Sequence, residues 1–326
     1  MSQTDWKARP EGGGRKAIRL IAAIGRHGGR PIARALLYPI TAYFLCMRAV
    51  ERRASRDFLR RLHGRPQGWW ATARHIHTFA STILDRVFLL SGRTGMFQMQ
   101  TEGLDALEAT LAKGRGVLVL GAHLGSFDAL RVLGRQRPDL KIRVLLDKAH
   151  NPALSELFEE LDPVLARHII DAGQDGTAVV LAMKQAIDEG ALVAMLADRS
   201  REGELAVPAP LLGQPAAFPA APWLIASALE VPVMLAFGLY RGGNRYQLVF
   251  EPFADTVKIP RAQRQAVLST LITRYAARLE HRLRTAPYNW FNFYDFWNVQ
   301  ARPRTPARAA LDDRPAVDGG AAGQRQ

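Results

Sequence analysis

Short apolar runs alternate with longer stretches of helical periodicity along most of the chain. Three runs, each bounded by glycine, proline or polar residues, lie at 117–120, 191–196 and 232–240. Runs of this length are typical of strands that are buried on both faces of a sheet. Amphipathic helices are expected at 68–92, 177–190 and 261–284. This alternation predicts an α/β fold with a central, mostly parallel sheet flanked by helices.

Polar side chains follow the strand at 117–120. After Gly121 and Ala122 come His123, Gly125, Ser126 and Asp128. In open α/β sheets, ligands usually bind at the carboxyl ends of strands. We interpret His123 as a general base oriented by Asp128. The backbone amides of Gly125 and Ser126 are candidates to hold an anion or a developing oxyanion. The alternative is a turn histidine that pairs with Asp128 only for stability.

The amino-acid composition limits the kinds of molecule that the protein is expected to bind. The single cysteine, Cys46, excludes an intramolecular disulfide and fits a reducing compartment. The net charge of +14 points to an anionic partner, either nucleic acid or a membrane surface. Residues 1–65 hold 15 Lys and Arg against 4 Asp and Glu, whereas residues 66–300 hold 24 against 23. Because the core is nearly neutral and the charge lies on an arm, we expect a membrane surface and no nucleic acid.

The basic arm contains two apolar pieces, at 17–25 and 35–47, separated by arginines. The second piece is about 20 Å long as a helix, against a hydrocarbon core of about 30 Å. An arginine-rich helix is expected at 48–65. This pattern favours an interfacial membrane anchor. Two alternatives stay open: the arm packs as an ordinary helix, or residues 31–47 form a single tilted span.

The expected domain organisation has three parts. A basic helical arm at 1–65 precedes a catalytic domain at 66–300, and the Ala-, Arg-, Pro- and Gly-rich tail at 301–326 is expected to be disordered. The sequence has no G-x-S-x-G elbow, Walker A loop, G-x-G-x-x-G after a strand or H-E-x-x-H motif. We therefore expect neither a metal nor a nucleotide cofactor.

The segment HLGSFD at 123–128 resembles the H-x4-D motif of the lysophospholipid acyltransferase superfamily. The longer pattern, over roughly residues 30–300, is similar to its branch of lipid A late acyltransferases. The resemblance implies that His123 deprotonates an acceptor hydroxyl, which attacks an acyl thioester directly. It also implies an acyl carrier protein or coenzyme A thioester as co-substrate, and a location at the cytoplasmic face of the bacterial inner membrane.

Two further strand ends carry candidate binding residues. The turn at 147–152 resembles the family's segment in which a basic residue precedes Asn-Pro, so Lys148 is a candidate to bind a phosphate of the acceptor or the carrier. Asp198 and Arg199 follow the strand at 191–196, where the family commonly has Asp-Gln or Asp-Arg. Arg199 would hold a phosphate of donor or acceptor in fork geometry. The alternative is a surface ion pair between Asp198 and Arg199.

The C-terminal aromatic cluster at 286–297 departs from the family pattern. It contains Asn289, Asn292 and Asp295 where the family tends to have basic residues. This ending is more similar to relatives that serve aryl polyene or other specialised lipid pathways. The acceptor is therefore expected to be a lipid A-like or another specialised lipid.

Three functions follow, from different classes. The first is an acyltransferase that moves an acyl chain to a hydroxyl of a lipid, with His123 as general base. The second is a basic protein that binds membranes or nucleic acid and in which the His123–Asp128 pair is inert. The third is a thioester or ester hydrolase that uses the same base to activate water.

Overall fold

The computed structural model describes residues 15–297 apart from 131, 133, 135, 136, 138, 201 and 202, and describes no side chains in 15–28. The predicted tail at 301–326 lies outside the described residues. The strands are β1 (Gln98–Glu102), β2 (Val117–Gly121), β3 (Ile142–Leu146), β4 (Ile169–Asp171), β5 (Leu192–Leu196), β6 (Ala206–Leu211), β7 (Gln214–Pro219), β8 (Val233–Tyr240) and β9 (Arg245–Ala254). The helices are α1 (Arg15–Met47), α2 (Ala49–His63), α3 (Trp69–Leu90), α4 (Leu104–Leu111), α6 (Pro152–Leu161), α7 (Pro163–Ala166), α8 (Gly176–Asp188), α9 (Ala221–Leu229) and α10 (Arg264–Thr285), with 3-10 turns η2 (Thr94–Met96), η3 (Phe127–Leu130) and η4 (Arg261–Gln263).

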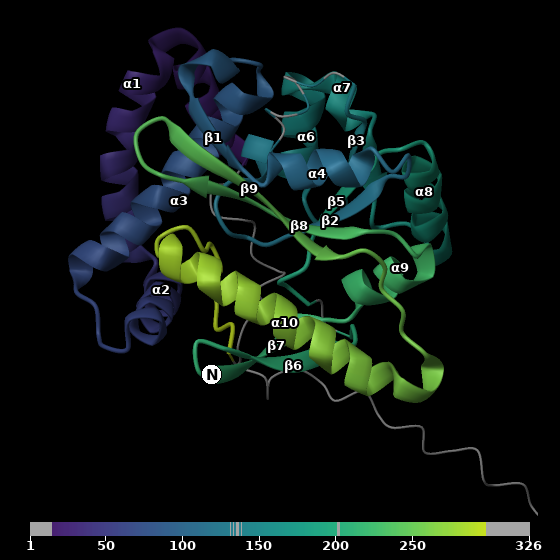
Figure 1. Ribbon diagram of the computed structural model, residues 1–326. Helices are drawn as coiled ribbons and strands as arrows, with labels where there is room; N and C mark the ends of the chain where they lie inside the picture. The colour runs from purple at the N-terminus through teal and green to yellow at the C-terminus, as the bar shows by residue number, and fades with distance from the viewer. Residues whose placement is uncertain are drawn as a thin grey trace, which may run out of the picture.

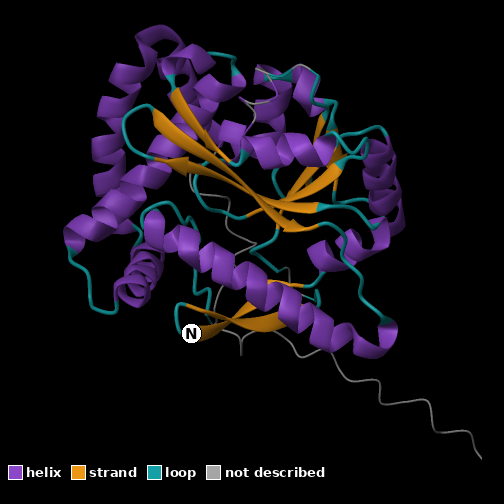
Figure 2. Cartoon of the chain, in the orientation of Figure 1, coloured by secondary structure: helices purple, strands orange, loops and turns teal. Residues whose placement is uncertain are grey.

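Seven strands form one sheet in the order β1-β9-β8-β2-β5-β3-β4, and β6 and β7 form a separate hairpin. Strands β8, β2, β5, β3 and β4 are parallel to one another, whereas β9 is antiparallel to β8. Helices flank this sheet (Figures 1 and 2). The α/β fold with a mostly parallel central sheet is therefore confirmed.

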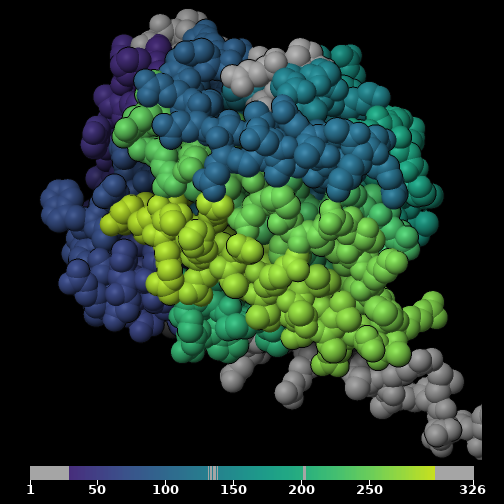
Figure 3. All heavy atoms as spheres, in the orientation of Figure 1, coloured from purple at the N-terminus to yellow at the C-terminus, as the bar shows by residue number. Residues whose placement is uncertain are grey.

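The central strand β2 is buried on both faces, as its apolar run predicts. Leu118 and Leu120 join a core cluster that includes side chains of α2, α8, α9 and α10. Val117 and Val119 join a second cluster with side chains of α1, α3 and α4. Figure 3 shows α4 and α10 covering much of the visible face. Because alternate side chains enter opposite cores, the backbone of β2 is held firmly in the middle of the domain.

Helix α1 packs along α3 and is bent where it meets the domain. Gly29, with φ 73°, has a non-helical conformation that favours glycine, and Pro31 follows it. Leu37 is buried against the domain, whereas Tyr38 is 70% exposed. Among the described residues, no helix combines the length and apolar character needed to cross a bilayer. The arm thus presents one face to the domain and another to solvent.

A buried ion pair joins α1 to the domain. Arg30 donates from Nε and a terminal nitrogen to the two carboxylate oxygens of Asp85 in α3, at 2.7 and 2.9 Å. Asp85 is fully buried and also accepts a hydrogen bond from the hydroxyl of Tyr246 in β9, at 2.9 Å. Arg86, the neighbour of Asp85 in sequence, instead donates to the carboxylate of Asp128.

Three strands were not predicted from the sequence. Strand β1 is short and polar and lies at the edge of the sheet, so it lacks an apolar run. The hairpin β6–β7 contains Pro208 and Pro210 in one strand and Pro215 and Pro219 in the other. Proline removes a hydrogen-bond donor and argues against a central strand. Both strands of this hairpin pair only with each other, which is why they tolerate proline.

Replacing Asp85 with alanine should lower the free energy of unfolding by about 3–5 kcal/mol, because Arg30 is then left as a largely buried charge without its partner. Chemical denaturation of purified protein measures this change. Asp57→Ala is the matched control, since Asp57 also pairs with arginines but is 34% exposed. Asp57→Ala should lower the free energy of unfolding by at most about 1 kcal/mol. Equal decreases in the free energy of unfolding for the two variants would show that the Arg30–Asp85 pair contributes no more than an exposed ion pair.

Candidate active site

The parallel register of β2 and β5 brings His123 and Asp198 together. Gly121 pairs with Leu196 at the ends of these strands, and the amide of Ala197 donates to the carbonyl of Gly121 at 3.0 Å. Two residues further on in each chain segment, His123 Nδ1 and Asp198 Oδ1 lie 2.7 Å apart. The backbone amide of His123 donates to Asp198 Oδ2 at 3.1 Å. Neighbouring strand ends thus hold an imidazole against a carboxylate by two hydrogen bonds.

The surroundings of Asp198 favour its ionised form, and this determines the tautomer of the neutral His123 ring. Burial alone would raise the pKa of Asp198, but His123, Arg199 and Asn292 lower it, and the pKa of Asp198 lies well below its usual value. An ionised carboxylate only accepts hydrogen bonds, so the proton of the neutral imidazole lies on Nδ1. Nε2 is thereby a proton acceptor, and the side chain of His123 is 24% exposed while that of Asp198 is fully buried.

The predicted contact between His123 and Asp128 is wrong. Asp128 lies on the 3-10 turn η3 and faces α3, where Arg86 Nε donates to its Oδ2 at 2.6 Å. The turn of the chain at Gly125 carries residue 128 away from the imidazole, whereas the register of β2 and β5 carries residue 198 towards it. Asp198, which the sequence assigned to substrate binding, therefore occupies the orienting position.

The predicted anion-binding amides are already engaged. The amide of Gly125 donates to the carbonyl of Asn289, and that of Ser126 donates to the carbonyl of Gly238, both at 2.7 Å. Gly125 has φ 75°, and a Cβ there would lie 2.1 Å from the carbonyl oxygen of Gly238. Both amides already donate to backbone carbonyls, so the prediction that they hold an anion or an oxyanion is wrong. The buried hydroxyl of Ser126 has no hydrogen-bond partner among the described residues.

Two predicted cations follow β5 and β3, the two strands that come after β2 in the order of the sheet. Arg199, which follows β5, donates from Nε to Asn292 Oδ1 at 2.6 Å and from a terminal nitrogen to the carbonyl of Phe291 at 3.1 Å. Its guanidinium carbon lies 5.7 Å from the centroid of the Tyr294 ring. Lys148 follows β3, the next strand of the sheet, and is half-buried. The two residues thus share one edge of the sheet with His123.

A second histidine–aspartate pair lies at the end of β3. His150 Nδ1 is 2.8 Å from Asp147 Oδ2, and its amide donates to Asp147 Oδ1 at 3.0 Å. These partners are three residues apart in one turn, and the side chain of His150 is 66% exposed. A base that must act without competition from bulk water needs a shielded position. The pair at His123 meets this requirement better than the pair at His150.

The C-terminal aromatic segment forms part of the site. Leu124 and Trp290 form an antiparallel bridge, and the amide of Phe291 donates to the carbonyl of His123 at 2.8 Å. Behind the segment, His75 Nε2 lies 2.7 Å from the carbonyl oxygen of Trp290, and its Nδ1 lies 2.8 Å from Ser55 Oγ. Sequence reasoning noted Asn289 and Asn292 only as departures from a family pattern. Their contribution depends on contacts between distant segments, which the sequence does not reveal.

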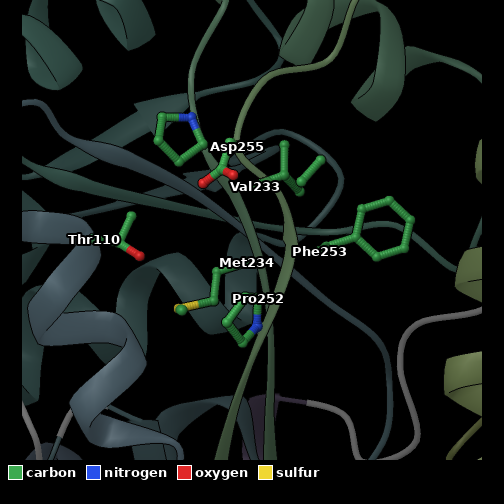
Figure 4. Close-up of a pocket in the computed structure, with 8 residues that line it drawn as sticks. Thr110, Val233, Met234, Pro252, Phe253 and Asp255 are labelled. Atoms are coloured by element: carbon green, nitrogen blue, oxygen red, sulfur yellow. The ribbon is translucent and has the colours of Figure 1, made fainter.

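A surface pocket lies elsewhere. It is lined by residues of α4, of the start of β8 and of the end of β9, including Thr110, Val233 and Phe253 (Figure 4). Val233 pairs with Leu118 near the beginning of β2, so this pocket lies at the amino end of the strand. His123 follows the carboxyl end. The pocket is thus separate from the histidine–aspartate pair.

Comparison with protein families gives a match over most of the chain. The family model described as "Bacterial lipid A biosynthesis acyltransferase" matches residues 76–298. This range contains the sheet, His123, Asp198 and the aromatic segment. A comparison with curated proteins finds no match.

The buried ring of His75 should make stability depend on pH. Burial lowers the pKa of His75 to about 4. The hydrogen bond to the backbone of Trp290 acts in the opposite direction but has a smaller effect. Between about pH 6.5 and pH 4 the unfolded chain therefore binds a proton that the folded chain does not. Stability should fall over this range as the pH falls, by about 3 kcal/mol for this group.

Denaturation of wild type and His75→Gln at pH 7 and pH 4.5 measures this difference. Glutamine does not titrate and has a donor and an acceptor for the same two partners. The variant should lose less stability than wild type on acidification, whereas the exposed control His281→Gln should behave as wild type. The same acid sensitivity in all three proteins would exclude His75 as its source.

Proposed function

Because the chain belongs to the family of bacterial lipid A biosynthesis acyltransferases, we propose that His123 is the general base that activates a lipid hydroxyl for attack on an acyl thioester. The observation that carries the proposal is the 2.7 Å contact between His123 Nδ1 and Asp198 Oδ1. It leaves Nε2 of a partly shielded imidazole as proton acceptor. Acyl transfer to a lipid follows from the family, and the roles of individual residues are proposed here.

The proposed reaction needs one base and no covalent enzyme intermediate. Nε2 of His123 takes the hydroxyl proton as the oxygen attacks the thioester carbonyl carbon. The tetrahedral intermediate then collapses, the carbon–sulfur bond breaks, and the leaving thiolate takes the proton back from the imidazolium. Asp198 remains ionised throughout, holds the ring in the required tautomer and stabilises its charged form. The products are the acylated lipid and a free thiol.

Charge that develops on the carbonyl oxygen requires a donor, and the amides of Gly125 and Ser126 are engaged elsewhere. We assign this role to Arg199, and to Lys148 the binding of a phosphate of the donor or the acceptor. Among the described residues, no ion pair is found for the ammonium group of Lys148. Both acyl carrier protein and coenzyme A present a phosphate next to the pantetheine arm. The donor is proposed to be one of these two thioesters, without a further cofactor.

The acceptor is proposed to be a lipid A-like or another specialised lipid. Asn289 and Asn292 are buried and serve the protein's own hydrogen bonds. They are therefore not surface groups that recognise a phosphorylated sugar. The proposal of a lipid from an aryl polyene or other specialised pathway therefore rests on the sequence similarity alone.

The enzyme is proposed to bind the cytoplasmic face of the inner membrane peripherally through its arm. Eight of the eleven large apolar side chains that are exposed in the described part of the chain lie on α1, α2 and α3: Ile32, Leu36, Tyr38, Tyr43, Met47, Val50, Trp69 and Trp70. Arg52 and Arg56 lie over the ring of Trp69, at 5.5 and 4.8 Å from its centroid. Exposed aromatic rings beside arginines suit an anionic bilayer interface.

Loss of the base should nearly abolish transfer. His123→Ala should lower kcat by about 10²–10⁴-fold, and Asp198→Asn by about 10³-fold or more. Asp128→Asn should have a smaller effect than Asp198→Asn, because Asp128 contacts Arg86 and not the imidazole. The assay follows labelled dodecanoyl groups from acyl carrier protein or coenzyme A into vesicles of bacterial lipid extract.

The matched control for this assay is His150→Ala, which removes the exposed histidine–aspartate pair and should retain most of the wild-type rate. A greater loss for His150→Ala than for His123→Ala would contradict the assignment of the base. Release of free fatty acid without labelled lipid, by wild type alone, would identify a hydrolase instead.

Membrane binding should depend on the exposed aromatic rings of α1 and of the start of α3. Trp70 is 89% exposed, and Trp70→Ser should weaken binding to phosphatidylglycerol-containing vesicles at least about tenfold, because an indole ring no longer enters the interface. Co-sedimentation measures the partition constant. Leu181→Ser is the control, since Leu181 is 62% exposed on α8, away from the arm. Equal losses for both variants would place the membrane contact elsewhere.

A further inference from the structure

Asn292 connects the carboxylate of the site to the neighbouring guanidinium. Its side chain is 3% exposed. Nδ2 donates to Asp198 Oδ2 at 3.0 Å, and Oδ1 accepts from Arg199 Nε at 2.6 Å. A carboxylate only accepts and a guanidinium only donates, so one orientation of the amide satisfies both partners. Asn292 is therefore fixed between an anion and a cation.

The backbone that carries Asn292 is tied to the loop of His123. The amide of Gly125 donates to the carbonyl of Asn289, and the amide of Phe291 donates to the carbonyl of His123. His75 holds the carbonyl of Trp290 from the opposite side. These contacts fix the position of the segment relative to the end of β2. The amide of Asn292 thus meets Asp198 in a defined geometry.

In this geometry the two carboxylate oxygens of Asp198 have different hydrogen-bond partners. Oδ2 of Asp198 accepts from Asn292 and from the backbone amide of His123, and Oδ1 accepts from the imidazole. With two donors on Oδ2, the carboxylate is held against rotation, and Oδ1 remains directed at Nδ1. Bonds of this kind between ionised and neutral groups are stronger than those between neutral groups.

Asn292 also separates two opposite charges. Arg199 follows Asp198 directly in sequence, yet its Nε and a terminal nitrogen bind the side chain of Asn292 and the carbonyl of Phe291. A direct ion pair between Arg199 and Asp198 would compete with the imidazole for the carboxylate. The amide, placed between them, keeps the guanidinium near the site without this competition.

We propose that Asn292 is a positioning residue for acyl transfer, which acts through Asp198 on the basicity and orientation of His123. This inference rests on the proposed function of the His123–Asp198 pair. The side chain of Asn292 is buried, and both ends of its amide bond groups of the protein. Its effect should therefore appear in kcat and be larger when the carboxylate of Asp198 is present.

A double-mutant cycle tests this dependence. Asn292→Leu should lower kcat about 10- to 100-fold while KM for the dodecanoyl thioester changes less than about twofold. In the Asp198→Asn background the same substitution should lower kcat by a smaller factor, because the carboxylate on which Asn292 acts is absent and only its bond to Arg199 is lost. The assay is the transfer of labelled dodecanoyl groups to lipid-extract vesicles, with the unfolding midpoint of each variant recorded.

Asn289→Leu is the matched control. Asn289 is also buried on this segment, and its side chain accepts from the amide of Tyr240 and donates to the carbonyl of Tyr240. Any loss of kcat that it causes should be equal in both backgrounds. Equal losses for Asn292→Leu in the two backgrounds would overturn the inference. A wild-type kcat in Asp198→Asn itself would instead refute the proposed function.

Discussion

The contact between His123 and Asp198 depends on the parallel register of β2 and β5. Because Gly121 pairs with Leu196, the residues two positions beyond each strand end are neighbours. A slip of one residue would turn the side chains of the shifted strand to the opposite face of the sheet. The register is fixed by the apolar side chains of both strands, which enter cores on the two faces. The chemistry of the site is thus set by the packing of the sheet.

Buried carboxylates recur around this sheet, and each has its own donors. Asp85 binds Arg30, Asp128 binds Arg86, Asp147 binds His150, and Asp198 binds His123 and Asn292. The first two attach α1 to α3 and α3 to the loop of His123. The last pair combines full burial of the carboxylate with partial exposure of the imidazole. This combination distinguishes a proposed base from structural ion pairs.

Sequence reasoning predicted the central strands of the sheet and one member of the His123–Asp198 pair. Strands β2, β5 and β8 have apolar runs long enough to recognise, and His123 follows one of them. The partner was misassigned because Asp128 is five residues away in sequence, whereas Asp198 is 75 residues away and becomes a neighbour only through the strand order. The amides of Gly125 and Ser126 were misassigned because their acceptors lie on β8 and on the C-terminal segment. Strand order and side-chain contacts of distant segments are properties that one sequence does not specify.

The central claim is that the neutral imidazole of His123 is the base of the reaction. The most direct test is a titration of ¹⁵N-labelled histidine by NMR, with the signals of His123 assigned by their loss in His123→Gln, compared with the pH profile of kcat/KM. We expect the proton of the neutral ring on Nδ1 and a titration midpoint that coincides with the acidic limb of the profile. A limb that does not follow the titration of His123, or a neutral ring protonated on Nε2, would contradict the account.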